Sequence, residues 1–388
     1  PELGQAQLHW HRATTSPPPS GLDPEKLAIQ AATHYLEARG EPSSFAHSFS
    51  AALAGIAQAG YCHSLSQNTG VADDTAPDAY AQITAICKDV LAYRYGFLRF
   101  SPTAKSRSES IPTPLPPDDS RPPGQAALAS AEPSAELLLS GSEKEKTAAE
   151  LPESGQVWLR EAAHAVTSPL SDRIEVALVN YLIKQPGTSL QEIDKVICSA
   201  FPGLFTPDTE YLQICLESYA EPDASGDWYL RPQDSPVERR KDLSEAESLI
   251  DHLGSRLGFS TQIRPSTTTP DGRATQHTFC WVDRHQQVQY WLFPIVSAVI
   301  GEIILQSTSP PSKSLIILPG GRSNLVAYKL HHDLRLGRLC KPSSHGWRFL
   351  KFRHLRWLDS NPLLSRENLD EQLSLDPLTY STPQLRLL

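Results

Sequence analysis

One stretch of the sequence, residues 314–330, joins an apolar run to a Pro-Gly-Gly turn with an arginine and then to the start of an expected helix. A Walker A loop needs spaced glycines and a following Gly-Lys, whereas Gly320 and Gly321 are adjacent and no such lysine follows. The Gly-x-Gly-x-x-Gly spacing of dinucleotide sites is absent as well. The sequence remains compatible with an anion site at a helix N-terminus, with Arg322 beside it and Ser323 as its cap. A tight turn that needs small residues explains the same sequence equally well.

Two acids are candidates for a divergent magnesium-dependent nuclease. Restriction-type nucleases use an Asp on one strand and a Glu-x-Lys or Asp-x-Lys on the next to hold Mg²⁺, which converts bound water into a nucleophile. Asp283 ends the apolar run 277–283 and is suitably placed, but the next run, 287–295, contains neither an acid nor a lysine. Glu302 follows on an expected helix, without a lysine two residues later. The simpler interpretation of Asp283 is a turn residue.

Motifs for methyl transfer to a DNA base are absent. Such enzymes usually show a glycine-rich Phe-x-Gly-x-Gly loop for S-adenosylmethionine, and a polar residue followed by Pro-Pro and an aromatic grips the flipped base. The nearest match is Ser-Asn-Pro-Leu at residues 360–363, which lacks the second proline and the aromatic. We therefore expect no cofactor site, no metal site and no methyltransferase active site in this chain.

The strongest physical signal is a basic segment, residues 322–357. It contains nine Lys or Arg and a single acid, Asp333, in a chain whose net charge is −9. Its last third interleaves cations with Trp and Phe, which suits phosphate contact and base stacking. The candidate nucleic-acid contacts are Arg322, Lys329, Arg335, Arg338, Arg348, Lys351, Arg353 and Arg356. The alternative is a sheet strand whose aromatics are core and whose charges form a solvated face.

Length and composition favour a cytoplasmic protein of two or three domains. The chain has 388 residues, its apolar runs are too short to span a bilayer, and its start lacks the layout of a signal peptide. The six cysteines form no Cys-x-x-Cys pair, which argues against a zinc ribbon and a disulfide framework. Because there is no methionine, even at the first position, we expect the sequence to be part of a longer protein.

The first part of the chain divides by composition into three. Residues 1–21 are a Pro-rich leader, and residues 22–100 contain three amphipathic segments that predict a helical bundle. The first of these begins with Asp23 and Pro24 and stops at Gly40. Residues 101–155 are rich in Pro, Ser and Glu and cannot bury enough apolar surface to fold, so we expect a disordered linker.

The second part of the chain predicts a winged-helix-like module and an α/β domain, so the fold class expected for the whole chain is multidomain α+β. Residues 156–240 show three helices and then a strand pair, but the third helix carries Asp208, Glu210 and Glu217 and no cation. That charge favours a protein partner over DNA reading. Residues 241–388 follow the order helix, three strands, helix, strand of a restriction-endonuclease-like domain, in degenerate form, with residues 347–358 as a closing strand.

Two stretches, residues 38–60 (ARGEPSSFAHSFSAALAGIAQAG) and residues 318–358 (from LPGGRSNLVAYKL to WRFLKFRHLRWL), resemble segments of a known family. The family is that of the long C-terminal extensions of large prokaryotic DNA methylase proteins associated with restriction and phage defence. The resemblance implies a role in DNA modification, with an S-adenosylmethionine-dependent domain upstream of Pro1. No catalytic residue can be carried over, because the cofactor loop and the Pro-Pro-aromatic motif are absent here.

Three functions are compatible with these patterns. The leading one is a non-catalytic region that binds or positions DNA for a methyltransferase, with DNA as its partner and no membrane contact. The second is a divergent magnesium-dependent nuclease that uses Asp283 and Glu302. The third is a protein-interaction scaffold, in which the acidic module docks a partner and the basic segment makes no contact with DNA.

Overall fold

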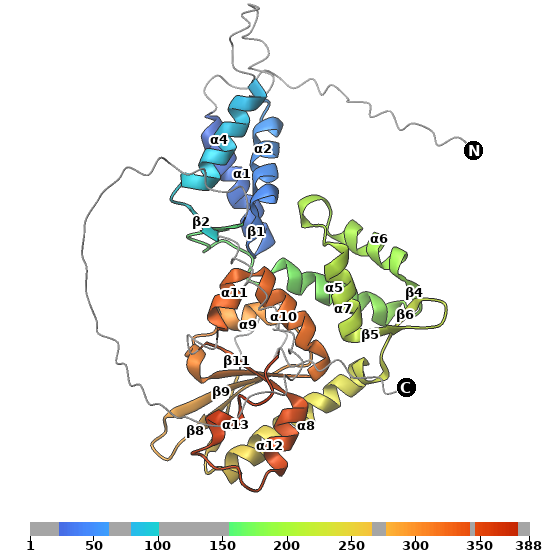
Figure 1. Ribbon diagram of the computed structural model, residues 1–388, viewed down its shortest axis with the longest axis vertical. Coiled ribbons are helices and arrows are strands. Elements are labelled where there is room, and N and C mark those ends of the chain that lie inside the picture. Colours follow the sequence, from blue (N-terminus) through green and yellow to red (C-terminus); the bar gives the residue numbers. More distant parts are fainter. Residues whose placement is uncertain (1–22, 62–78, 101–154, 266–276, 342–345, 379–388) are drawn as a thin grey trace, which may run out of the picture.

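The computed structural model describes residues 23–61, 79–100, 155–265, 277–341 and 346–378, which form a mixed α/β fold with three sheets (Figure 1). The expected leader, 1–21, and nearly all of the expected linker, 101–155, lie outside these residues. None of the described helices is long and apolar enough to cross a membrane. Each sheet belongs to one unit of the fold, and we number these units first, second and third in chain order.

The described residues of the first unit form three helices and a small antiparallel sheet of order β1-β3-β2. Its elements are α1 (Pro24–Arg39), β1 (Ser43–Ser44), α2 (Phe45–Gln58), α4 (Ala79–Tyr93), β2 (Phe97–Phe100) and β3 (Gln156–Leu159). The cap signals of α1 are confirmed, since the Asp23 side chain accepts from the Glu25 N–H and Gly40 ends the helix in the left-handed conformation. The helices expected within 22–100 are therefore present, together with a sheet that was not expected.

Strand β3 changes the interpretation of residues 101–155. Phe100 of β2 pairs with Gln156 of β3 in antiparallel register, so both ends of the intervening segment enter the same sheet. The described residues on either side of 101–154 therefore belong to the same unit of the fold. The boundary expected at residue 156 moves to the end of β3, because so short a strand carries no sequence signal of its distant partners.

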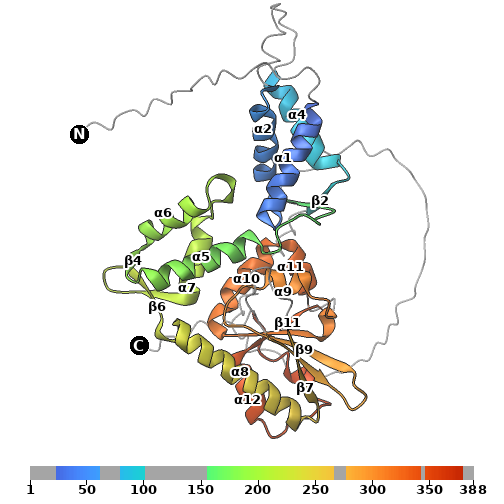
Figure 2. The ribbon, with the colours of Figure 1, turned by 180° about the vertical axis from the view of Figure 1, so that it is seen from behind.

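The second unit repeats the element order of the first. It consists of α5 (Leu170–Lys184), β4 (Thr188–Ser189), α6 (Leu190–Ala200), α7 (Thr209–Tyr219), β5 (Ala220–Pro222) and β6 (Asp227–Leu230). Its sheet order, β4-β6-β5, corresponds strand for strand to β1-β3-β2, and every pair in both sheets is antiparallel. In Figure 2 the helices of the first unit are blue to cyan, and those of the second unit are green. The sequence patterns did not reveal this internal repeat.

The third unit is a five-stranded sheet of order β11-β10-β9-β8-β7 with helices on both faces. Its elements are α8 (Pro236–Arg256), β7 (Ser260–Pro265), β8 (His277–Val282), β9 (Val288–Pro294), α9 (Gly301–Gln306), β10 (Ser314–Leu318), α10 (Ser323–His332), α11 (Leu334–Leu339), β11 (Arg348–Lys351), α12 (Phe352–Ser360) and α13 (Leu369–Gln372). Strands β9, β10 and β11 run parallel, and β7, β8 and β9 are antiparallel neighbours. Helices α9, α10 and α11 lie on one face and α8, α12 and α13 on the other (Figure 1).

The central strand β10 connects two hydrophobic cores. Leu315 and Ile317 point into the core formed with α8 and α12, whereas Ile316 and Leu318 point into the core formed with α10. All five residues of the strand are buried, as expected for a strand that is covered on both faces. The start of this unit also moves, since α8 begins at Pro236 and crosses the boundary expected at residues 240/241.

The closing strand expected at residues 347–358 is only partly confirmed. Arg348–Lys351 forms β11, but Phe352–Ser360 folds as the helix α12. The buried apolar side chains of α12 recur at every third position, which is a helical spacing: Phe352, Leu355 and Leu358. The alternation of cations and aromatics in this stretch therefore concealed a change from strand to helix.

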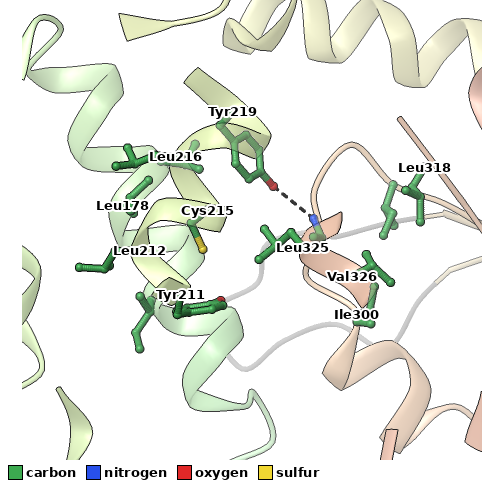
Figure 3. Packing of buried hydrophobic residues seen from close by; sticks show 14 of the residues in the cluster. Leu178, Tyr211, Leu212, Cys215, Leu216, Tyr219, Ile300, Leu318, Leu325 and Val326 are labelled. Atoms are coloured by element: carbon green, nitrogen blue, oxygen red, sulfur yellow. Dashed lines mark hydrogen bonds between the residues drawn. The ribbon is translucent and has the colours of Figure 1, made fainter. Parts of the chain in front are cut away.

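The second and third units share one hydrophobic core. Leu178, Leu212 and Leu216 of the second unit belong to the same buried cluster as Leu325 and Val326 of α10. Figure 3 shows these side chains facing each other across the gap between α7 and α10, with Tyr219 between the two units. The two modules expected from the sequence therefore do not have separate interiors.

Candidate functional site

Arg322, the expected phosphate contact of the glycine turn, is buried. Its side chain is 1% exposed and forms an ion pair with Asp234, and it also donates to the carbonyl of Ser218. The guanidinium carbon lies 3.6 Å from the centroid of the Tyr219 ring. Ser218 and Tyr219 belong to α7 of the second unit, and Asp234 lies between the second and third units. Arg322 therefore connects the third unit to the second and does not present its charge to solvent.

The glycine turn is a short 3₁₀ turn, Gly320–Arg322, between β10 and α10. Neither Gly320 nor Gly321 has a positive φ, so the backbone conformation does not require glycine. Ser323 does not cap α10, because it is 1% exposed and its Oγ has no hydrogen-bonding partner among the described residues. The two side chains expected to complete an anion site thus point into the protein, and the turn is a structural joint.

Lys329 lies in a buried ion cluster with Asp172 and Glu175 of α5. Its Nζ is 2.5 Å from Asp172 Oδ1, 2.5 Å from Glu175 Oε2 and 2.9 Å from the carbonyl oxygen of Ala298. All three charged side chains are 1% exposed. The carboxylates have further donors, since Asp172 accepts from the Gly301 N–H at 2.8 Å and Glu175 accepts from the Ala298 N–H at 2.8 Å.

The ion cluster has clear electrostatic causes and no solvent access. Burial raises the pKa of Asp172 to about 6, although Lys329 opposes that shift. Burial alone would lower the pKa of Lys329, but the carboxylates of Asp172 and Glu175 raise it above its ordinary value. Lys329 therefore remains a cation that holds α10 against α5, and no nucleic acid can reach it.

Arg335 and Arg338, on α11, contact the first unit. Arg335 forms an ion pair with Asp333 at 2.6 Å, donates to the Gly40 carbonyl at 2.9 Å and lies 4.0 Å from the centroid of the Trp158 ring. Arg338 lies 4.6 Å from the centroid of the Phe100 ring. These two arginines connect the third unit to the sheet of the first unit.

The four cations of β11 and α12 are paired with acids from other segments. Arg348 contacts Asp370 at 2.8 Å, both Lys351 and Arg353 contact Asp376 at 2.8 Å, and Arg356 contacts Glu245 of α8 at 2.7 Å. The hydrogen bond from Arg353, followed by that from Lys351, lowers the pKa of Asp376 to about 2. The interleaved aromatics differ in exposure, since Trp347 and Phe352 are 3% and 5% exposed, whereas Trp357 is 43% exposed and its ring centroid lies 5.2 Å from that of His354.

The two nuclease candidates lie on different elements. Asp283 is in the turn between β8 and β9, where its carboxylate accepts from the His285 N–H, the Gln287 N–H and the Gln289 side chain at 2.8 to 2.9 Å. These hydrogen bonds lower its pKa, as expected for a turn residue. Glu302 is on α9. Within the described ranges, no group of three or more His, Cys, Asp or Glu side chains could hold a metal ion.

A groove of about 490 Å³ lies between α7 and α10. Exposed Glu210 and Glu217 of α7 line one wall, with Ile214 between them, and Tyr328 and Ala327 of α10 line the other. Neither glutamate forms an ion pair with a cation in the described part of the chain. The charge that remains available on this face is therefore negative.

The buried acids Asp172 and Glu175 were missed by the sequence interpretation. They follow each other at helical spacing on α5, on the same face as the apolar residues Ile174 and Leu178. Two carboxylates on the apolar side of an amphipathic helix need a buried cation, and this is the signal that could have found the ion cluster.

The chain was compared with family models, with curated proteins and with solved structures, and none of the three comparisons found a match. Its function is therefore inferred from the contacts and charges of its own residues.

Proposed function

We propose that this chain is a non-catalytic protein-interaction scaffold whose basic segment stabilises the fold and does not contact DNA. The observation that carries the proposal is the pairing of the basic segment. Seven of its eight candidate cations form ion pairs with carboxylates of the same chain: Arg322, Lys329, Arg335, Arg348, Lys351, Arg353 and Arg356. Three of these cations, Arg322, Lys329 and Lys351, are at most 2% exposed, so a phosphate cannot reach them.

Two winged-helix-like modules form part of this proposal. The support is the order helix, strand, helix, helix, strand, strand, which the second unit has and which the described residues of the first unit also follow. A DNA-reading module places its third helix in the major groove. In the second unit this helix, α7, exposes Glu210 and Glu217 beside its contact with α10, where the Tyr211 and Tyr328 rings are 5.4 Å apart. The charge and the packing of α7 favour contact with a protein.

A degenerate restriction-endonuclease-like domain is the proposed assignment of the third unit. Its support is the order α8, β7, β8, β9, α9, β10 around a mixed sheet. Strands β8 and β9 contain no acid and no lysine, so the unit lacks the side chains that would hold a catalytic magnesium ion between these strands. We assign it a structural role, as the platform on which the second unit is fixed by the ion cluster.

A second candidate is the positioning of DNA within a methylase protein, as the resemblance implies. The observation that favours it is the exposure of Trp357, 43%, on the same helix as Arg353 and Arg356, whose side chains are 59% and 45% exposed. In that case an upstream domain would supply the S-adenosylmethionine chemistry, and α12 would contact the duplex. The scaffold is preferred because both arginines are already paired with carboxylates of the same chain.

Titration of a labelled duplex at low salt, about 50 mM, tests the scaffold proposal. The wild-type chain is compared with a variant that carries Arg348→Ala, Lys351→Ala, Arg353→Ala and Arg356→Ala. We expect no saturable duplex binding by either protein and a lower melting temperature for the variant, because its ion pairs are lost. Salt-dependent duplex binding by the wild type that disappears in a folded variant would overturn the proposal.

A further inference from the structure

The groove between α7 and α10 has two charged positions on a single helix face. Glu210 and Glu217 are seven residues apart on α7, so they lie on the same side, about 10.5 Å apart at 1.5 Å per residue. Asp208, which caps α7, adds a third carboxylate at the same end as Glu210. No lysine or arginine lines the groove. The groove is therefore complementary to a ligand with two separated positive charges.

The centre of the groove is apolar and fixed in shape. Ile214 lies between the two glutamates on α7, and Ala327 of α10 also lines the groove. The Tyr328 ring is stacked on His332, with centroids 3.7 Å apart, and its hydroxyl donates to Asp208 at 3.4 Å. Burial, followed by the charges of Asp208 and Glu210, raises the pKa of Tyr328 above its ordinary value, so its hydroxyl stays a neutral donor.

Two other ligand classes fit the groove less well. A nucleic acid would bring phosphates against two glutamates, which is unfavourable at short range. A metal ion would need clustered ligands, but His331 and His332 at the end of the groove do not form a metal-holding group with the nearby glutamates or with any other described residue. A cationic polypeptide satisfies both the charged ends and the apolar centre.

We propose that this groove docks a segment of a partner protein in the polyproline II conformation, which carries two Lys or Arg residues three positions apart with an apolar side chain between them. Polyproline II has three residues per turn and advances about 3.1 Å per residue, so cations three positions apart lie on the same side, about 9 Å from each other, and match Glu210 and Glu217. An apolar residue between them points to another side of the segment and contacts the opposite wall, which includes Tyr328. This inference rests on the proposed scaffold function and names the class of partner that the scaffold holds.

Fluorescence anisotropy with a labelled peptide that contains Arg-Ala-Leu-Arg, added to the full chain, tests the inference. The variant E210Q/E217Q removes both charges at nearly constant side-chain volume, and we expect its affinity to fall about fivefold to tenfold. The matched control E161Q/E221Q removes two exposed glutamates outside the groove and is expected to bind as the wild type does. Raising the salt concentration should weaken the wild-type complex.

A second variant tests the shape of the groove independently of its charge. Ala327→Trp fills part of the groove and leaves both glutamates in place, so it should also weaken peptide binding. Absence of peptide binding by the wild type, or equal binding by the wild type and E210Q/E217Q, overturns the inference. Neither result involves duplex DNA, whereas failure of the scaffold proposal is seen in the duplex titration, so the two failures can be distinguished.

Discussion

The basic segment and the acidic groove differ in how much of their charge is paired within the chain. The basic segment has many charges in sequence and most of them are paired with acids, whereas the groove has few charges and they are exposed. The basic segment contains nine cations and one acid, yet seven of its cations are paired with carboxylates of the same chain. The groove is lined by two glutamates, and both are exposed without a cationic partner in the described ranges. A dense run of charge along the chain is therefore a poor guide to the charge that a partner meets.

The difference has a physical cause in burial. Lys329 and Arg322 are each 1% exposed, and a buried charge without a counter-ion would destabilise the fold by several kcal/mol. Distant acids such as Asp172 and Asp234 satisfy that requirement. Glu210 and Glu217 are hydrated, so the fold does not require a cation beside them, and they remain available for binding.

The largest expected effect on stability is at Lys329, the buried cation of the ion cluster. Lys329→Met leaves Asp172 and Glu175 buried without their cation, and we expect the free energy of unfolding to fall by about 3–5 kcal/mol. Urea denaturation of the full chain measures this loss. Lys184→Met, on an exposed end of α5, is the matched control and should change the stability by less than about 0.5 kcal/mol.

A triple variant separates the lost ion pair from the lost side-chain packing. Lys329→Met combined with Asp172→Asn and Glu175→Gln removes all three charges, so it should recover part of the stability lost in the single variant. If Lys329→Met alone unfolds no more easily than Lys184→Met, the ion cluster is not what fixes the second unit to the third.

A smaller, pH-dependent effect is expected at Asp376. Its pKa is about 2 in the folded chain, below the ordinary value of about 3.9, so its pairing with Arg353 and Lys351 contributes stability above about pH 4. That contribution is lost as the pH falls from about 4 to about 2, and partial exposure limits it to about 1 kcal/mol. Asp376→Asn should lower the stability at pH 7 and have little effect at pH 2, as measured by thermal melts across this range. An equal loss at both pH values would contradict the assignment.

The smallest effect is expected at Arg356, an exposed member of the basic segment. Its side chain is 45% exposed and that of its partner Glu245 is 48% exposed. Arg356→Ala should therefore cost only about 0.5 kcal/mol, and a double-mutant cycle with Glu245→Ala should give a coupling energy of similar size. A loss above about 2 kcal/mol would contradict the expectation that exposed cations of the segment stabilise the fold less than buried ones.

Local signals predicted much of the fold. The cap of α1 at Asp23, its stop at Gly40 and the helical periodicity of α5 and α7 depend on neighbouring residues, and the structure confirms them. The pairing of β2 with β3 could not be predicted, because these two strands are far apart in the chain. The α12 helix was missed because its buried positions also fit a strand when only its first residues are considered.

The candidate site was predicted less well than the fold, for a related reason. The partners of Lys329 are separated from it by 157 and 154 residues, and no local pattern connects them. The acids of α7 were noticed in the sequence, but the groove exists only because α10 packs beside α7. Residue types and spacing identified which side chains are charged, and tertiary packing decided which charges remain free.

Hydrogen–deuterium exchange of the full chain, with duplex DNA or with the Arg-Ala-Leu-Arg peptide, tests the central claim most directly. It reports on the basic segment and on the acidic groove in one measurement. The account predicts slower exchange in α7 and α10 with the peptide and no change in β11 and α12 with the duplex. Slower exchange in β11 and α12 with the duplex, and unchanged exchange in α7 with the peptide, would contradict it.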